Sequence, residues 1–275
     1  MISWRLGLNT KKPYMRAWND LVKRIKSPED TVEIAVVGKY IGLHDAYKSV
    51  YEALSHGGFA ANVKVKLRKV NPEELTRENV AKALDGAHGL VVPGGFGERG
   101  FQGKIEAIRH ARETKLPFLG LCLGLQAAVT EFARNVCGIA DANSTEFRAD
   151  CSPVIDLMDA QKKVKDLGGT MRLGAYPCKL VKGSRAQAAY GADTVQERHR
   201  HRWEVNNRFR DGLQEKGLKV SGFHEELELV ELVELPDHPW FVAVQFHPEF
   251  KSKPTKPHPL FRELVKAAYA RKKGK

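Results

Sequence analysis

The chain has 275 residues, of which 42% are hydrophobic and 28% charged, and its formal net charge is +12. This length can form one large α/β domain or two small ones. No run of about 18 uncharged apolar residues occurs, which argues against a membrane-spanning helix. The four cysteines form no CxxC pair and no cysteine–histidine cluster with zinc spacing. We therefore expect no metal site, no membrane partner and a reducing, cytoplasmic location.

The excess positive charge lies at the two ends of the chain. Residues 1–30 carry seven Lys/Arg and three Asp/Glu, residues 251–275 carry nine and one, and residues 31–250 carry equal numbers of each sign. A nucleic-acid-binding domain usually has a basic stripe across its body. We therefore interpret the ends as solvated basic segments and expect no nucleic-acid partner. An acidic partner surface is the alternative.

Residues 1–30 are expected to be an interdomain linker or lead-in. They hold one set of apolar residues at the spacing of a short amphipathic helix, namely Trp18, Leu21, Val22 and Ile25. The segment has too few apolar positions to form a domain. We expect the folded domain over residues 31–270 and a basic tail over residues 271–275.

Strands alternate with helices from residue 31 onward. The pattern predicts strands at 32–38, 63–70, 89–92, 117–121 and 241–246. It predicts helices at 45–56, 73–84, 104–113, 123–136 and 260–270, with Gly57-Gly58 ending the first. Short glycine-bearing turns between such elements favour an α/β fold with a mostly parallel sheet and helices on both faces. After about residue 140 the signal weakens until the strand at 241–246.

The segment Gly120-Leu121-Cys122-Leu123-Gly124 places a nucleophile between two glycines at a predicted strand-to-helix junction. Such a turn is tight and presents the nucleophile at the carboxyl end of the sheet. The positive end of the helix favours a thiolate, and the free N–H of Leu123 can stabilise an oxyanion. A buried structural cysteine is the alternative.

A thiolate nucleophile requires a base, and His247 is the strongest candidate among ten histidines. It directly follows a predicted strand, so it too is expected at the sheet edge. Glu249 lies two residues further on, where its carboxylate can orient the imidazole and stabilise the imidazolium. A surface histidine beside a solvated glutamate is the alternative. His199 and His201 are rival bases, but they lie in a charged run with no predicted strand before them.

A glycine turn, Gly94-Gly95-Phe96-Gly97, follows the predicted strand at 89–92. Such a turn commonly lets backbone N–H groups face a ligand. By itself it could hold a phosphate or be a plain turn. No Walker A sequence occurs anywhere in the chain, which weakens the case for an ATP site.

Three motifs together resemble the class I glutamine amidotransferases: Pro93–Gly97, Leu121–Gln126 and Gln245–Phe250. Five further motifs narrow the resemblance to the glutaminase half of the CTP synthase family: Ala35–Tyr40, Asp45–Val50, Asn143–Phe147, Asp166–Gly174 and Glu197–Arg202. The resemblance covers roughly residues 31–270. It implies a flavodoxin-like sheet that carries a Cys-His-Glu triad.

The resemblance also implies residue roles. Cys122 attacks the side-chain amide of glutamine, His247 shuttles the proton, and Glu249 orients His247. The N–H groups of Gly95 and Leu123 hold the oxyanion. The residues expected to bind glutamine are Gly95, Leu123, Gly124, Leu125, Gln126, Glu146 and Arg202, with Glu146 for the α-ammonium and Arg202 for the α-carboxylate. By itself, Arg202 in its charged run is typical of a solvated basic surface.

Other implications concern cofactors and partners. The family uses ATP, Mg²⁺ and the activator GTP in its full-length form, with Arg172 and Arg99 near the GTP site. This domain is expected to need no cofactor of its own. The amidoligase half that aminates UTP to CTP is not in this sequence, so we expect a piece of a longer, homo-oligomeric enzyme. Two alternatives stay open: a free-standing γ-glutamyl hydrolase or peptidase, and a non-catalytic assembly module.

Two positions depart from the family pattern. Trp203 stands where Tyr or Phe is usual, a change that we expect to be tolerated, and His44 stands where Pro is common.

Overall fold

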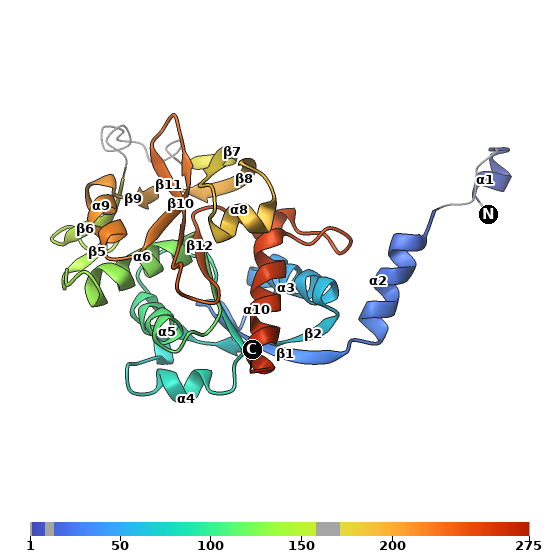
Figure 1. Ribbon diagram of the computed structural model, residues 1–275, viewed down its shortest axis with the longest axis horizontal. Coiled ribbons are helices and arrows are strands. Elements are labelled where there is room, and N and C mark those ends of the chain that lie inside the picture. Colours follow the sequence, from blue (N-terminus) through green and yellow to red (C-terminus); the bar gives the residue numbers. More distant parts are fainter. Residues whose placement is uncertain (1, 9–13, 158–170, 275) are drawn as a thin grey trace.

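The computed structural model describes residues 2–8, 14–157 and 171–274 (Figure 1). Residues 166–170 of the motif at 166–174 lie outside them. In this described part, no helix has both the length and the apolar character needed to cross a bilayer.

A nine-stranded sheet forms the centre of the described part, in the order β2-β1-β3-β4-β12-β11-β10-β7-β8. Parallel pairing joins the first five strands: β2 (Val63–Val70), β1 (Asp30–Val37), β3 (Gly89–Val92), β4 (Phe118–Leu121) and β12 (Phe241–Val244). Antiparallel pairing adds the other four: β11 (Leu229–Glu234), β10 (Lys219–His224), β7 (Arg172–Leu180) and β8 (Thr194–His201).

Helices cover both faces of this sheet (Figure 1). One face carries α4 (Val80–Leu84), α5 (Phe101–Glu113), α6 (Leu123–Asn135) and α9 (Asn207–Glu215). The other carries α3 (Lys48–Ala61), α8 (Arg185–Tyr190) and α10 (Pro259–Lys272). Along β1 the buried side chains alternate between the two cores: Ile34 and Val36 face α3 and α10, whereas Ala35 and Val37 face α5 and α6. A strand buried on both faces explains its continuous apolar sequence.

The smaller elements complete the described part. A three-stranded sheet consists of β5 (Ala142–Ser144), β6 (Ser152–Leu157) and β9 (Trp203–Val205). Single 3₁₀ turns occur at η1 (His44–Tyr47), η2 (Pro72–Glu74) and η3 (Pro248–Lys251). The N-terminal helices are α1 (Ile2–Arg5) and the predicted amphipathic helix, α2 (Arg16–Lys26), in which Leu21 is the one buried residue.

The predicted sheet with helices on both faces is confirmed, and two predicted boundaries are wrong. Gly57 and Gly58 do not end α3, which continues to Ala61. A Cβ atom on Gly57 would lie 2.8 Å from the Phe261 carbonyl oxygen, so glycine is needed there for helix α10 to approach. The predicted helix at 73–84 is divided into η2 and the short α4.

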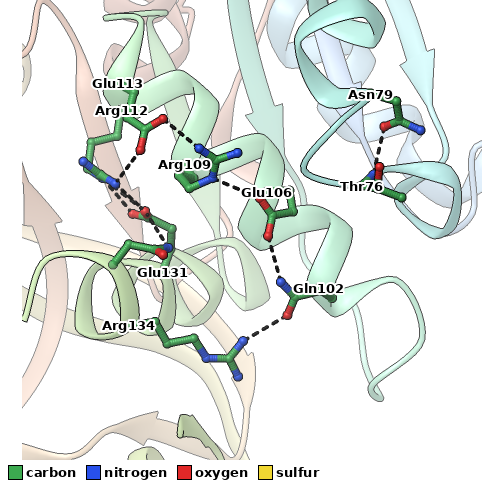
Figure 2. Close-up of polar contacts among 10 residues, drawn as sticks. Thr76, Asn79, Gln102, Glu106, Arg109, Arg112, Glu113, Glu131 and Arg134 are labelled. Carbon is green, nitrogen blue, oxygen red and sulfur yellow. Dashed lines mark hydrogen bonds and ion pairs between the residues drawn. The ribbon is translucent and has the colours of Figure 1, made fainter. Parts of the chain in front are cut away.

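A polar network joins α5 to α6 on the outer side of the fold (Figure 2). The Arg112 guanidinium donates two hydrogen bonds to the Glu131 carboxylate of α6, from Nη2 to Oε1 at 2.8 Å and from Nε to Oε2 at 3.0 Å. The Glu131 side chain has no exposed area, whereas that of Arg112 is 18% exposed. Burial raises the pKa of Glu131 despite this partner, so the carboxylate depends on Arg112 for its charge.

Replacing Arg112 with Met should therefore lower the free energy of unfolding by about 3 kcal/mol, because it leaves a buried carboxylate without its cation. The double variant Arg112→Met/Glu131→Met should recover most of the loss. Urea unfolding followed by circular dichroism measures both. Lys266→Met is the surface control, since Lys266 is 52% exposed in its pair with Glu263, and it should cost at most about 1 kcal/mol. A double variant as unstable as Arg112→Met would contradict this account.

Candidate active site

Cys122 occupies a strained turn between β4 and α6. Its φ is 52° and its ψ is −104°, a conformation that L-residues rarely adopt. Its N–H donates to the Val244 carbonyl at 2.7 Å, and its carbonyl accepts from the N–H of Leu125 at 2.9 Å and of Gln126 at 3.2 Å. The turn thus binds the end of β12 on one side and begins α6 on the other.

The two glycines that flank the cysteine are required by packing. A Cβ atom on Gly124 would lie 2.2 Å from the Val92 carbonyl oxygen at the end of β3. One on Gly120 would lie 2.8 Å from the backbone of Gly124. Real Cβ atoms do not approach backbone atoms so closely. The G-x-C-x-G pattern is therefore explained by the contact of this turn with β3 and with itself.

His247 and Glu249 form a close pair at the end of β12. The imidazole Nδ1 donates to Glu249 Oε1 at 2.8 Å, and both side chains are largely buried. The Phe250 ring stacks on the imidazole with 5.5 Å between centroids. Because Nδ1 is occupied by the carboxylate, Nε2 is the nitrogen left for a reacting group.

The imidazole lies beside the cysteine. Gly94 lies next to both side chains. A Cβ atom added to Gly94 would lie 2.9 Å from Cε1 of His247 and 3.4 Å from the Cβ atom of Cys122. Nε2 has no hydrogen bond of ordinary geometry among the described residues. Burial alone would lower the pKa of His247, but the Cys122 sulfur and then the Glu249 carboxylate favour the imidazolium and raise the pKa to about 10.

The glycine turn at 94–97 is held from two sides. Lys39 Nζ donates to the Phe96 carbonyl at 2.9 Å, and the Gly97 N–H donates to Glu146 Oε1 at 2.9 Å. Gly95 faces the start of α6, where its Cβ position lies 3.6 Å from the Leu123 side chain. Leu123 is the first residue of α6, so its N–H has no acceptor within the helix. Both predicted oxyanion residues therefore lie next to Cys122.

Two buried glutamines connect the cysteine to β9. Gln126 Nε2 donates to the Trp203 carbonyl at 2.9 Å and to Gln245 Oε1 at 3.4 Å. Gln245 Nε2 in turn donates to the Cys122 sulfur at 3.8 Å. The Trp203 side chain at this departure from the family pattern is partly buried against the core.

The Arg202 guanidinium acts on the Glu146 carboxylate through its charge. Burial raises the pKa of Glu146. The Gly97 N–H and the cations Lys39, Lys104 and Arg202 oppose this shift. Of the residues predicted to bind glutamine, Gly124 and Leu125 complete the first turn of α6. The structure therefore brings all seven of them to the edge of the sheet or to the segments beside it.

A cavity of about 270 Å³ opens at the cysteine. Cys122, His247 and Glu249 line it together with Gly94 and Gly95. Four aromatic residues also line it, namely Tyr40, Tyr47, Phe96 and Phe250. Within the described residues no cluster of three His, Cys, Asp or Glu side chains could hold a metal ion.

Neither of the predicted nucleotide residues lines this cavity. Arg99 is exposed, pairs with Glu73 at 3.0 Å and lies over the Tyr40 ring at 6.0 Å. Arg172 is 4% exposed and is held by two carboxylates, Glu204 at 3.0 Å and Glu231 at 2.6 Å. A contact between Arg172 and GTP stays a prediction, and it would require these ion pairs to break.

The rival bases His199 and His201 belong to the same buried network as Arg172. His199 Nε2 lies 2.6 Å from Glu231 and His201 Nε2 lies 2.7 Å from Glu204. Both imidazoles are therefore already paired with buried carboxylates and not with Cys122. The sequence reasoning missed Lys39, Lys104 and Gln245 beside the site. Lys39 and Gln245 belong to the motifs Ala35–Tyr40 and Gln245–Phe250, but no local pattern singles out Lys104.

Comparisons with known proteins show the family. The model of the family described as Glutamine amidotransferase class-I matches residues 42–267. The chain therefore belongs to the class I glutamine amidotransferases. Within that class it groups with the glutaminase domains of CTP synthases.

That grouping rests on individual relatives. The chain is 56% identical to the CTP synthase of Symbiobacterium thermophilum over 98% of its own length and 51% of the relative, and 54% identical to that of Ruminiclostridium cellulolyticum over 96% and 50%. It thus spans about half of each. The solved glutaminase domain of Trypanosoma brucei CTPS with bound acivicin superposes with a TM-score of 0.82 at 40% identity, covering 86% of this chain and 94% of that one. A putative GMP synthase subunit from Thermoplasma acidophilum, 16% identical with a TM-score of 0.54, shares the fold alone.

The raised pKa of His247 provides a test of the contact with sulfur. Because Cys122 is the largest influence that favours the imidazolium, Cys122→Ser should lower the pKa of His247 well below the value of about 10. An NMR pH titration of the imidazole Cε1–H measures it. Cys137→Ser removes a thiol outside the site and should leave the titration unchanged. A His247 pKa that is the same in all three proteins would contradict the proximity described here.

Proposed function

We propose that this chain hydrolyses L-glutamine to L-glutamate and ammonia through a thioester on Cys122. The observation that carries the proposal is the strained turn that sets Cys122 beside the His247–Glu249 pair at one sheet edge. A thiol, an imidazole with one free nitrogen and an orienting carboxylate are the groups that acyl transfer to sulfur requires.

In the first step the Cys122 thiolate adds to the side-chain amide carbon of glutamine. The carbonyl oxygen becomes an oxyanion, which the N–H groups of Gly95 and Leu123 stabilise. His247, as imidazolium, gives its Nε2 proton to the amide nitrogen. The C–N bond breaks, ammonia leaves, and a γ-glutamyl thioester remains on sulfur.

In the second step water cleaves the thioester. Neutral His247 now accepts a proton from water through Nε2, and the oxygen adds to the thioester carbon. The C–S bond breaks, glutamate leaves as its γ-carboxyl group releases the second water proton to solvent, and the protonated His247 again faces a thiolate. Glu249 keeps Nδ1 protonated in both steps, so the same nitrogen takes and returns the proton.

The substrate's α-groups have candidate partners near the cysteine. Glu146 carries a carboxylate for the α-ammonium, and Arg202 carries a guanidinium fork for the α-carboxylate. Gln126 and the backbone of residues 123–125 would contact the side-chain end.

The complete enzyme is part of the proposal. Because the chain spans about half of its curated relatives, we infer that the ammonia is used by an amidoligase domain that converts UTP to CTP with ATP and Mg²⁺ under GTP activation. In this scheme residues 1–30 connect the domains, residues 31–270 are the glutaminase, residues 271–275 are a basic tail, and the full enzyme is a homo-oligomer. The free state of all four cysteines agrees with a cytoplasmic location.

Cys122→Ala should abolish glutamine hydrolysis, because no other group can form the thioester. An ammonia-release assay coupled to glutamate dehydrogenase measures the rate, which we expect to be low in the isolated wild-type chain. A diazo-ketone analogue of glutamine should add once to the wild-type protein, at Cys122 by peptide mapping. Cys151→Ala is the matched control and should behave as wild type. Full activity in Cys122→Ala would refute the mechanism.

Glu249→Gln should lower kcat by roughly 10²–10⁴-fold with little change in KM, because the imidazole loses its orientation and the stabilisation of its charged form. Steady-state kinetics with glutamine give both constants. Glu226→Gln, an exposed carboxylate in the turn after β10, is the control. A KM effect with unchanged kcat would assign Glu249 to binding instead. Faster cleavage of γ-glutamyl peptides than of glutamine would favour a γ-glutamyl hydrolase over the proposed reaction.

A further inference from the structure

A lysine ammonium is buried behind the glycine turn of the site. Lys104 lies in the first turn of α5, and its side chain has no exposed area. Its Nζ atom has no hydrogen-bond partner among the described residues. It is one of the largest fully buried side chains among the described residues. Lysine is almost never buried in this way unless it is paired.

The ammonium points toward the functional residues. Nζ lies 3.7 Å from the place that a Cβ atom on Gly95 would occupy. Negative charge on Cys122 and on Glu146 stabilises the Lys104 ammonium, whereas the positive charge of Lys39 destabilises it. Lys104 is therefore enclosed between the predicted oxyanion turn, the nucleophile and the predicted ligand of the α-ammonium.

Such a group is costly for the fold. An uncompensated buried charge destabilises a protein, and evolution usually removes it by pairing or by an apolar substitution. A methionine at this position would fill similar space without charge. Local rules that are broken without a structural gain are expected at functional sites.

We propose that Lys104 is a positioning residue of the glutaminase site, whose buried ammonium supplies positive charge behind Gly95 and Cys122 that favours the anionic states of the reaction. This inference rests on the proposed function. The states concerned are the Cys122 thiolate before attack and the oxyanion that forms beside Gly95. A fixed charge in a buried site acts more strongly than one in water and needs no reorganisation when the oxyanion forms.

Other charged groups around α5 are paired with residues other than Lys104. On α5 itself, Glu106 pairs with Arg109 at 3.0 Å. On α6, Glu131 is held by Arg112. On η2, Glu73 pairs with Arg99 and Glu74 accepts from Asn71. The charges that act on Lys104 are thus Lys39, Cys122 and Glu146, all from the site.

The protonation of Lys104 gives the proposal a pH signature. Burial, with a smaller contribution from Lys39, lowers its pKa to about 8. The charge is therefore lost above pH 8, before His247 loses its proton near pH 10. Below pH 8 the protein carries the cost of the buried ammonium. That cost is relieved as pH rises from about 8 toward the unfolded-state value of 10.5.

The test compares the wild type with Lys104→Met and with the exposed control Lys266→Met. The first readout is alkylation of Cys122 by iodoacetamide, a neutral reagent, with the site mapped by mass spectrometry. At pH 7, Lys104→Met should react on the order of tenfold more slowly, because the reacting thiolate loses a nearby buried positive charge. The second readout is kcat for glutamine between pH 6 and 10. Its alkaline decline should move from near pH 8 in the wild type to near pH 10 in Lys104→Met.

The third readout is thermal stability. Lys104→Met should melt at a higher temperature than the wild type at pH 7, and the difference should shrink at pH 10. A purely structural lysine would give a lower melting temperature and an unchanged alkaline decline, and this result would overturn the proposal. Should Lys104→Met not fold, Lys104→Arg replaces it. Its charge persists at pH 10, so an alkaline decline that stays near pH 8 in that variant would also overturn the proposal.

The readouts separate this inference from the proposed function. If the wild type hydrolyses glutamine and Lys104→Met matches it at every pH, the role of Lys104 is refuted and the glutaminase assignment stands. If the wild type does not hydrolyse glutamine while alkylation still depends on Lys104, the glutaminase assignment fails and the effect on Cys122 stands.

Discussion

A φ of 52° at Cys122 is unfavourable for a side chain with a Cβ atom, and such conformations cost on the order of 1–3 kcal/mol. The surrounding structure maintains it through backbone hydrogen bonds to Val244, Leu125 and Gln126. The close contact of Gly124 with Val92 leaves no room for the turn to relax toward β3. The result is a sulfur that stands at the end of the sheet instead of continuing the line of β4.

Sheet register then determines what the sulfur meets. Strands β4 and β12 are parallel neighbours in which Leu121 pairs with Val244. Their carboxyl ends therefore reach the same edge, although they are more than a hundred residues apart in sequence. Cys122 follows one strand directly, and His247 follows the other after a short extension. The His247 N–H donates to the Arg198 carbonyl at 2.8 Å, which fixes that extension against β8. The relay thus depends on strand pairing more than on loops.

The same logic explains what could be predicted from the sequence. Buried parallel strands such as β4 and β12 are short apolar runs, and the proposed triad residues lie directly or shortly after them, so local pattern and motif were sufficient to select these candidates. Among the antiparallel strands, β8 was missed because its buried side is polar. Its inward residues are Glu197, His199 and His201, which a hydropathy pattern assigns to solvent. Their burial depends on polar partners, and two of these, Glu231 for His199 and His258 for Glu197, lie far away in the sequence, where no local signal reports them.

Two buried cations show why pairing matters for function. Arg172 is nearly as buried as Lys104, but two carboxylates and the face of Tyr176 at 4.6 Å surround its guanidinium. Its charge is neutralised where it lies and can act only weakly on its surroundings. Lys104 has no such partner, so its field is not cancelled and extends to the nearest groups that can become negative. Those groups are Cys122, Glu146 and the place beside Gly95 where an oxyanion would form. A buried cation thus serves the architecture when it is paired, and the chemistry of its neighbours when it is not.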